Sequence, residues 1–300
     1  MLITTIIVSY NTADLTCQAI KSVIDDALKN QIEHEVIVVD NASSDNSVKK
    51  IKQLTKKFSQ VRLFENKKNL GFAKANNQAI KKAKGEFIFL LNSDAQVIPG
   101  SLTRLAHALQ TNQALGIVSP LLLNPDKTLQ NQGGDLPSLF SVANQMFFLD
   151  DLPIIGQYLP SPQKKFLPKK SPTYMGWVAG TAMMIKSEVI DQVGFLDEKI
   201  FMYAEDVDYC WRARQQGFQI ALVPEAKVIH YGSASSSSAR AIEGEFLGLI
   251  YLFKKHQPSW KLSFLKLILL TGASLRVVLF AIIGQKEKSL IYKQVLDKLH

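Results

Sequence analysis

Short apolar segments alternate with segments of helical period through the first hundred residues, and this alternation limits the folds that the chain can adopt. The apolar segments are rich in β-branched and aromatic residues, as expected for buried strands. They are residues 2–9, 35–39, 61–65 and 87–91. The segments with apolar side chains at helical spacing are residues 12–29, 47–58 and 76–84. Such an alternation predicts an α/β fold: a mostly parallel sheet with helices on both faces.

Length, charge and cysteine content narrow the class of protein. A chain of 300 residues with 47% hydrophobic and 20% charged residues can bury a large core. The net charge of +9 favours anionic partners such as nucleotides or an anionic membrane. The lysines occur as dispersed pairs without interleaved aromatic residues, so we expect no nucleic-acid partner. Cys17 and Cys210 show no metal-ligand or disulfide pattern, and the first segment lacks the basic start of a signal peptide, so we expect a cytoplasmic location.

Polar residues follow each of the predicted strands. They are Ser9-Tyr10-Asn11 after the first strand, Asp40 and Asn41 after the second, Asn69 to Asn77 beyond the third, and Asn92-Ser93-Asp94 after the fourth. Ligands of open parallel sheets bind beyond the carboxyl ends of the strands, so these residues are candidates for one shared site. Helix capping is the alternative explanation for each segment taken alone, with Asn11 or Thr12, Asp45 or Asn46, and Asn76 as caps.

The polar segments carry side chains that can bind a nucleotide, although the usual phosphate-binding loops are missing from the sequence. No G-x-G-x-x-G follows the first strand and no P-loop occurs, which argues against a dinucleotide-binding fold and a P-loop enzyme. Asp40 can accept hydrogen bonds from a ribose or a base edge. Asp94 stands between small residues and can hold a divalent cation that balances a diphosphate.

The second half of the chain supplies further candidates. Residues 205–217 have helical spacing that places Asp208 and Arg212 as an i,i+4 pair on the face of Glu205, whereas Asp206 points elsewhere. Asp206 can therefore serve as a general base. A helix N-terminus that is simply enriched in acids is the alternative. His230 closes a predicted strand and can contact metal or phosphate, although a structural role is the alternative.

The ordered set of these segments resembles a known enzyme family. The segments are IIVSYN, VVDNASSD, NLGFAKANN, LLNSD, GWVAGTAMMI, FMYAEDVDYCWRARQQG and VIHYGSAS, and they extend over residues 3–235. Together they resemble the family 2 inverting glycosyltransferases, and most closely the bacterial rhamnosyltransferase-like subgroup. The resemblance implies a GT-A fold, a nucleotide-sugar donor, a divalent cation (Mg²⁺ or Mn²⁺), and direct displacement at the anomeric carbon.

The resemblance also assigns roles to residues of this chain. Asp206, of the pair Glu205 and Asp206, would be the catalytic base, and Asp94 would bind the metal with His230 as a second contact. The donor site would comprise Ser9, Tyr10, Asn11, Asp40, Asn41, Asn69, Gly71, Phe72, Asn76, Asn92, Ser93, Trp177 and Gly180. Asn92 replaces the first acid of the family's D-x-D motif, so we expect a weaker metal site than in relatives that keep both acids.

Two segments outside this pattern concern the acceptor and the membrane. We predict a glycosyltransferase domain over residues 1–235, in which the proline-rich residues 133–175 are either a structural insertion or an acceptor-side segment. Residues 236–300 would form a helical tail. Within it, residues 262–284 are apolar but carry Lys266 and Arg276 and are flanked by lysines. They would lie on an anionic membrane surface, pack on the domain or in a homodimer, or span the bilayer.

The expected activity is transfer of a sugar, with rhamnose as one candidate, from a dTDP- or UDP-linked donor to a glycan or lipid-linked acceptor. This would serve cell-surface polysaccharide synthesis at the inner face of the plasma membrane. A nucleotidyltransferase that makes activated sugars is one alternative, although the segment SYNTADLT lacks the glycine-rich basic loop of such enzymes. A non-catalytic carbohydrate- or membrane-binding module is the other alternative.

Overall fold

The computed structural model describes residues 1–164, 171–232 and 238–299. The chain forms two compact units: the first unit is Met1–Gln132 with Phe166–Ser235, and the second unit is Gly133–Lys165 with Ser236–His300. Residues 133–175 were predicted to belong to the N-terminal domain, whereas the described residues 133–164 belong to the second unit with the C-terminal helices. The predicted boundary between residues 235 and 236 lies outside the described residues.

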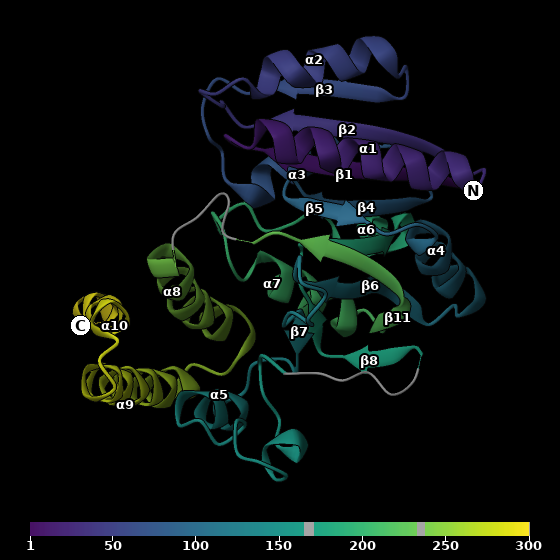
Figure 1. Cartoon of the computed structure of the whole chain (residues 1–300). Helices are drawn as coiled ribbons and strands as arrows, with labels where there is room; N and C mark the ends of the chain where they lie inside the picture. Colours follow the sequence, from purple (N-terminus) through teal and green to yellow (C-terminus); the bar gives the residue numbers. More distant parts are fainter. Residues whose placement is uncertain (165–170, 233–237, 300) are drawn as a thin grey trace. The chain divides into compact units, whose positions relative to one another are not determined.

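The first unit is built on one large sheet (Figure 1). Its strands are β1 (Leu2–Ser9), β2 (Glu33–Asp40), β3 (Val61–Glu65), β4 (Phe87–Asn92), β5 (Ala95–Val97), β6 (Leu115–Leu123), β8 (Thr173–Met175), β10 (Ala182–Lys186) and β11 (Gln219–His230). The order is β3-β2-β1-β4-β10-β6-β11-β5, and β8 also pairs with β11. Strands β1, β2, β3, β4, β6 and β11 point one way, and β5, β8 and β10 point the other way. The prediction of a mostly parallel sheet is confirmed.

Helices cover both faces of this sheet, as predicted. They are α1 (Ala13–Lys29), α2 (Ser47–Lys57), α3 (Phe72–Ile80), α4 (Ser101–Thr111), α6 (Ser187–Val193) and α7 (Glu205–Gln215). Successive residues of a strand point to opposite faces, so Ile3 and Ile7 of β1 join one buried cluster and Ile6 joins another. The first cluster contains side chains of α1, α2 and α4, and the second contains side chains of α3, α6 and α7.

Two predicted elements differ from the observed ones. Helix α3 begins at Phe72, four residues before the predicted start, directly after Gly71 with its φ of +82°. Asn76 is therefore inside the helix and is not its N-cap; its Nδ2 donates to the Phe72 carbonyl oxygen at 2.9 Å. The sequence also predicts two separate strands over residues 218–223 and 227–231, but the structure joins them in the single strand β11. The pairing of β11 with β6 shifts register around Pro224 because proline has no N–H to donate.

Strand β10 brings the second half of the chain to the site. It runs antiparallel to β4, with Ala182 opposite Leu91. The Asn92 N–H continues this pairing by donating to the Thr181 carbonyl oxygen at 2.9 Å. The residues just before β10, including Gly180, therefore lie beside the carboxyl end of β4. The short strand β9 (Trp177–Val178) precedes them in the chain.

The second unit is largely helical. Its elements are β7 (Gly133–Gly134), α5 (Leu139–Met146), a 3₁₀ helix (Gly156–Tyr158), α8 (Ser238–His256), α9 (Trp260–Ile282) and α10 (Lys286–Leu299). Residues of α5, α8, α9 and α10 share one apolar cluster. Arg276 of α9 is buried; its guanidinium donates to the carbonyl oxygens of Gln145 and Met146 and stacks on Phe148. These contacts accommodate a charge within the apolar segment, since a buried charge needs hydrogen-bond partners.

Candidate active site

The carboxyl ends of β1, β2 and β4 bring the first group of predicted residues together. Ser9 lies opposite Asp40 in the β1–β2 register, and Asn92 ends the neighbouring strand β4. The Thr12 hydroxyl donates to Ser93 Oγ at 2.9 Å and ties the start of α1 to the turn after β4. Parallel strands thus place polar residues from distant parts of the sequence at one edge of the sheet, as the sequence analysis expected.

Asp40 offers a carboxylate oxygen to a ligand. Its Oδ2 accepts a hydrogen bond from the Ser43 N–H at 2.9 Å, whereas Oδ1 is buried and has no hydrogen-bond partner in the described part of the chain. Leaving a buried carboxylate oxygen unpaired is unfavourable, so a ligand hydroxyl or N–H that reached it would be stabilising. The exposed Tyr10 and Asn11 follow Ser9 at the same edge, and Asn11 Oδ1 accepts from the Ser44 N–H at 2.7 Å.

Asn41 organises the loop that leads into α3. Its Nδ2 donates to Asn69 Oδ1 at 2.8 Å, and its Oδ1 accepts from the Leu70 N–H at 3.0 Å. The Gly71 N–H also donates to Asn69 Oδ1, at 2.9 Å. Asn41 and Asn69, both predicted to bind the donor, therefore fix the shape of this loop through bonds to one another.

Gly71 allows two loops to meet at the site. A Cβ on this residue would lie 2.6 Å from the Phe201 carbonyl oxygen, which accepts a hydrogen bond from the Phe72 N–H at 2.9 Å. The segment before α7 is thereby held against the start of α3. Tyr203 and Ala204, the last residues of that segment, have φ angles of +68° and +85°. Such strained backbone is typical of functional sites.

Asp206 is fixed at the first turn of α7. Its Oδ2 accepts from the Gly180 N–H at 2.9 Å, and its Oδ1 accepts from the Val207 N–H at 2.8 Å. A Cβ on Gly180 would lie 3.4 Å from the Phe72 ring and 3.6 Å from the Asp206 Cβ, so these three predicted residues are adjacent. Burial raises the pKa of Asp206, and the two N–H bonds oppose that rise.

Glu205 precedes Asp206 and is fully enclosed. Burial and then the neighbouring charge of Asp206 raise the pKa of Glu205 to about 8. Its Oε2 has no hydrogen-bond partner among the described residues. Near neutral pH this environment favours the protonated form of Glu205. The predicted ion pair on the same helix is confirmed, since Arg212 Nε lies 2.8 Å from Asp208 Oδ2.

Asp94 and His230 meet at the start of β5 and the end of β11. The His230 Nε2 lies 3.3 Å from Asp94 Oδ1, and both side chains are largely buried. The Tyr231 N–H donates to the Asp94 carbonyl oxygen at 2.9 Å, which holds the two chain segments together. The sequence analysis paired these residues as metal contacts, and the structure places them side by side.

This donor pair fits a divalent cation that is also bound by a ligand. Across the described ranges, no group of three or more His, Cys, Asp or Glu side chains could enclose a metal ion. Two protein donors are enough where phosphate oxygens and waters complete the coordination, as is usual for Mg²⁺. Neighbouring donors of an octahedral ion with bonds of about 2.1 Å lie ~3.0 Å apart, close to the observed separation.

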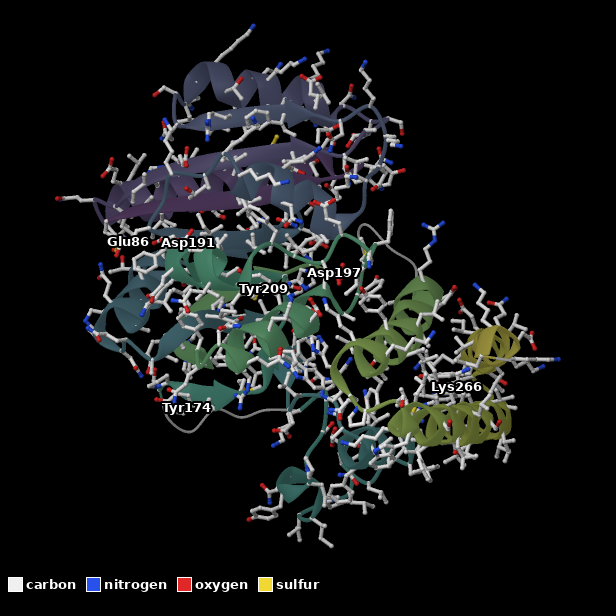
Figure 2. The ribbon with its side chains drawn as sticks, turned by 180° about the vertical axis from the view of Figure 1, so that it is seen from behind. Glu86, Tyr174, Asp191, Asp197, Tyr209 and Lys266 are labelled. Atoms are coloured by element: carbon white, nitrogen blue, oxygen red, sulfur yellow. The ribbon has the colours of Figure 1, made fainter. Side chains whose placement is uncertain are left out.

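Several neighbouring residues were not identified from the sequence. Gln130 contacts His230, and Phe201 contacts the loop at Gly71. Neither residue belongs to a spacing pattern in the sequence. The only signal was that Phe201 is an aromatic residue four positions before Glu205. Tyr209 of α7 (Figure 2) was not predicted either; it is buried, and burial raises its pKa. Trp177, which was predicted to border the donor, is partly buried in β9.

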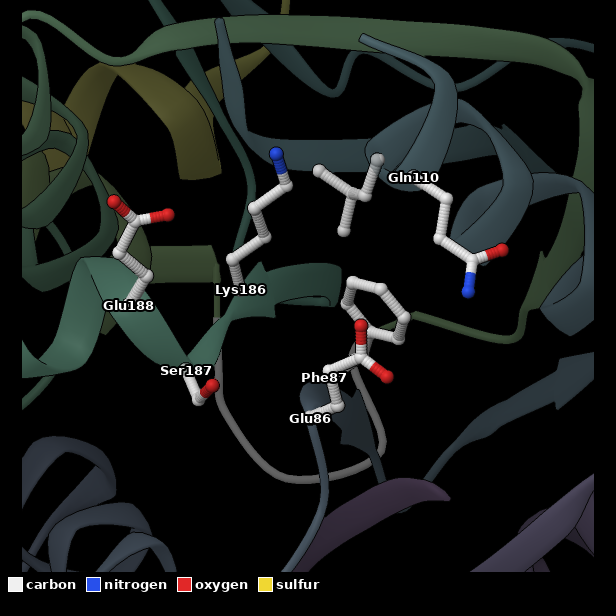
Figure 3. A pocket seen from close by; sticks show the side chains of 7 residues that line it. Glu86, Phe87, Gln110, Lys186, Ser187 and Glu188 are labelled. Carbon is white, nitrogen blue, oxygen red and sulfur yellow. The ribbon is translucent and has the colours of Figure 1, made fainter. Parts of the chain in front are cut away.

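A separate cavity of about 360 Å³ lies at the other edge of the sheet (Figure 3). It is lined by Glu86, Phe87, Leu109, Gln110, Lys186, Ser187 and Glu188. Phe87 begins β4 and Lys186 ends the antiparallel β10, so this cavity is a strand length away from Asn92 and Asp94. It holds none of the predicted site residues.

A family model and a sequence relative of this chain both belong to glycosyltransferases. Residues 4–193 match the family model described as glycosyl transferase family 2. The N-acetylglucosaminyl-diphospho-decaprenol L-rhamnosyltransferase of Mycobacterium tuberculosis is 27% identical over 247 residues, which are 75% of this chain and 76% of the relative. This match supports neither alternative class, the nucleotidyltransferase or the non-catalytic module.

Two solved structures share the fold. The mannosyltransferase PcManGT of Pyrobaculum calidifontis, in complex with GDP-Man and Mn²⁺, superimposes with a TM-score of 0.58 and 16% identity over 99% of this chain and 86% of its own. GalNAc-T7 with UDP, GalNAc and Mn²⁺ gives a TM-score of 0.61 and 17% identity over 85% of this chain and 48% of its own. The predicted GT-A fold is confirmed.

Substituting Gly71 tests the contact between the two loops. In Gly71→Ala the new Cβ would clash with the Phe201 carbonyl oxygen, in addition to the strain of a positive φ. Gly194→Ala is the matched control, because Gly194 has the same φ of +82° but open space around it. We expect Gly71→Ala to lower the free energy of unfolding by about 1–3 kcal/mol more than the control does, measured by urea denaturation. Equal losses in the two variants would contradict this contact.

Proposed function

The chain belongs to glycosyl transferase family 2, and we propose that it inverts the anomeric centre while moving a sugar from a nucleoside-diphosphate donor to a hydroxyl of a glycan or lipid-linked acceptor. The proposal is carried by one observation: the Gly180 N–H holds Asp206 beside Phe72, next to the carboxyl ends of β4 and β2, which lead to Asp94 and Asp40. A base and a nucleotide pocket would then share one edge of the sheet.

The residues of the strand edge would hold the donor. Oδ1 of Asp40 would accept a hydrogen bond from the base or the ribose, since it lacks a partner in the described structure. Asp94 and His230 would bind a divalent cation, which when bound supplies positive charge next to the diphosphate. Asn92 and Ser93 would face the sugar and phosphates, as amide and hydroxyl groups that donate and accept.

Asp206 would act as the general base. As the acceptor oxygen forms its bond to the anomeric carbon, its proton passes to Asp206, and the bond to the diphosphate oxygen breaks with the electron pair going to the leaving group. A single displacement of this kind inverts the centre and needs no second carboxylate nucleophile, unlike a retaining glycosidase. The raised pKa of Asp206 strengthens it as a base, and the proton kept by Glu205 limits charge repulsion in the pair.

The name of one relative supports the proposed donor and acceptor classes. The mycobacterial relative is named as an L-rhamnosyltransferase that acts on a lipid-linked diphosphate sugar. We propose the same class here: a dTDP- or UDP-linked sugar such as rhamnose, and an acceptor used in cell-surface polysaccharide synthesis. The reaction would take place in the cytoplasm, at the inner face of the plasma membrane, where lipid-linked acceptors are reached.

Helix α9 would provide the membrane contact. Among the described residues it is the helix long and apolar enough to cross a bilayer, by length and composition only. One of its faces is exposed and largely apolar; it consists of Trp260, Phe264, Leu267, Leu275, Val278 and Ile282, each 41–77% exposed. Their spacings are three or four residues except between Leu267 and Leu275, where the exposed Thr271 lies. Its opposite face is packed in the second unit. Lys254, Lys255, Lys261, Lys286 and Lys288 flank the helix, which favours an anionic lipid surface over a second copy of the same basic helix.

Replacing Asp206 tests the proposed chemistry. Asp206→Asn keeps the size of the side chain but removes its basicity, so we expect the turnover of donor to fall by about 10²–10⁴-fold while donor binding changes little. The measurement is nucleoside diphosphate release with acceptor present, together with donor affinity by calorimetry. Asp191→Asn, an exposed position on α6, is the control. Near-normal turnover of Asp206→Asn would contradict its role and would direct attention to Glu205.

Vesicle binding tests the exposed face of α9. We expect the full chain to sediment with vesicles that contain anionic lipid and not with neutral vesicles. Leu267→Glu should weaken this binding because it places a charge within the apolar face, whereas Gln294→Glu, which adds the same charge at an exposed position of α10, should not. Equal binding of both variants, or self-association of the chain through this face, would contradict the membrane assignment.

A further inference from the structure

The imidazole of His230 has a polar partner at each ring nitrogen. Nδ1 lies 2.8 Å from Gln130 Oε1, and Nε2 lies 3.3 Å from Asp94 Oδ1. Since the His230 and Asp94 side chains are only 16% and 5% exposed, solvent has little access to either contact. In the neutral ring, these two contacts therefore decide which of the two nitrogens carries the proton.

The orientation of the Gln130 amide is fixed by a group that can only accept. Gln130 Nε2 lies 2.7 Å from the His230 carbonyl oxygen and 2.7 Å from Asn124 Oδ1. A backbone carbonyl cannot donate, so the amide atom that faces it must be the NH₂ group. The carbonyl oxygen of the Gln130 side chain then necessarily faces His230 Nδ1.

This orientation decides the tautomer of His230. An amide oxygen can only accept a hydrogen bond, so His230 Nδ1 must carry the proton that it donates toward Gln130 Oε1. In the neutral ring Nε2 is then bare, and its lone pair points toward the Asp94 carboxylate. Two electron-rich atoms at 3.3 Å repel each other unless a proton on Nε2 or a metal ion supplies positive charge between them. A metal-binding histidine commonly has this arrangement, with its other nitrogen donating to an oxygen behind it.

A turn on the surface holds Gln130 in place. Asn124, which accepts from the Gln130 amide, donates through Nδ2 to Thr128 Oγ1 at 2.8 Å. The Thr128 hydroxyl donates in turn to Asp126 Oδ1 at 2.6 Å. The backbone is also fixed, because the Gln130 N–H donates to the Leu122 carbonyl oxygen at 2.9 Å. The amide therefore has little freedom to rotate.

We propose that Gln130 is a positioning residue that keeps the proton of His230 on Nδ1 and so presents the bare Nε2, together with Asp94, to a divalent cation. This inference rests on the proposed function, in which the two residues bind the cation of a nucleoside-diphosphate donor. It adds a residue from the turn after β6 to the site, although Gln130 itself touches neither cation nor substrate.

The tautomer can be measured directly in the metal-free wild-type chain. A long-range ¹H–¹⁵N spectrum of protein with ¹⁵N-labelled histidine distinguishes protonated from bare ring nitrogens, and comparison with His230→Gln identifies the signals of this ring among the 5 histidines. We expect a proton on Nδ1, and we expect Gln130→Leu to let the proton move to Nε2. A bare Nδ1 in the wild-type chain would overturn the proposal.

Metal affinity gives a second readout that needs no donor or acceptor. Binding of Mn²⁺ alone is followed through the electron paramagnetic resonance signal of the free ion. Gln130→Leu should weaken binding by about 10–100-fold, the usual loss for a residue that supports a metal ligand. Gln130→Glu loses the same N–H donors but still accepts from Nδ1, so its affinity should remain close to that of the wild type. Gln113→Leu, the same change at an exposed position, should have no effect.

The outcomes separate this inference from the proposed function. Equal weakening in Gln130→Leu and Gln130→Glu would mean a merely structural role and would overturn the inference. Unchanged affinity in Gln130→Leu would overturn the inference as well. If His230→Ala nevertheless binds Mn²⁺ more weakly than the wild type, the cation site of the proposed function still stands. If His230→Ala binds Mn²⁺ as well as the wild type does, the cation site of the proposed function fails together with the inference.

Discussion

The antiparallel pairing of β10 with β4 is the constraint on which the site depends. The parallel strands β1, β2 and β4 bring their carboxyl ends to one edge, but none of them carries a candidate base. Because β10 runs the other way, its beginning lies at that edge, and Gly180 just before it donates to Asp206 at the first turn of α7. Without this reversal, Asp206 would lose the bond from Gly180 that holds it beside these strand ends.

The site retains groups that the fold leaves unsatisfied. Asp40 Oδ1 and Glu205 Oε2 are buried without partners in the described structure, and Tyr203 and Ala204 have positive φ angles. Each of these features costs stability, of order 1–3 kcal/mol for an unpaired buried group or a strained residue. A ligand that donates to Asp40 Oδ1 would recover part of that cost, so the unpaired oxygen would contribute to the affinity for a donor.

The sequence predicted the parts of the fold that depend on local patterns. Strand β1 and helix α1 follow directly from apolar periodicity, and the rule that parallel sheets bind ligands at their carboxyl ends brought Asp40 and Asp94 together. The predicted start of α3 was wrong because a tertiary contact, and not a capping side chain, sets where the helix begins. This contact is the hydrogen bond from the Phe72 N–H to the Phe201 carbonyl oxygen. Gln130 was missed because its role depends on an amide that meets a histidine one hundred residues away, and no spacing in the sequence signals such a contact.

The central claim is that the strand edge of the first unit binds a nucleotide sugar together with a divalent cation. A ligand that binds only the folded state raises its stability, by about 2.7 kcal/mol at a concentration 100 times its dissociation constant. The most direct measurement is therefore a thermal-shift screen of the wild-type chain and Asp94→Asn against nucleotide sugars, with and without Mn²⁺. We expect at least one dTDP- or UDP-linked sugar to raise the melting temperature of the wild type, more strongly with Mn²⁺, and the effect of Mn²⁺ to be lost in Asp94→Asn. No shift with any donor, or the same dependence on Mn²⁺ in both chains, would contradict the account.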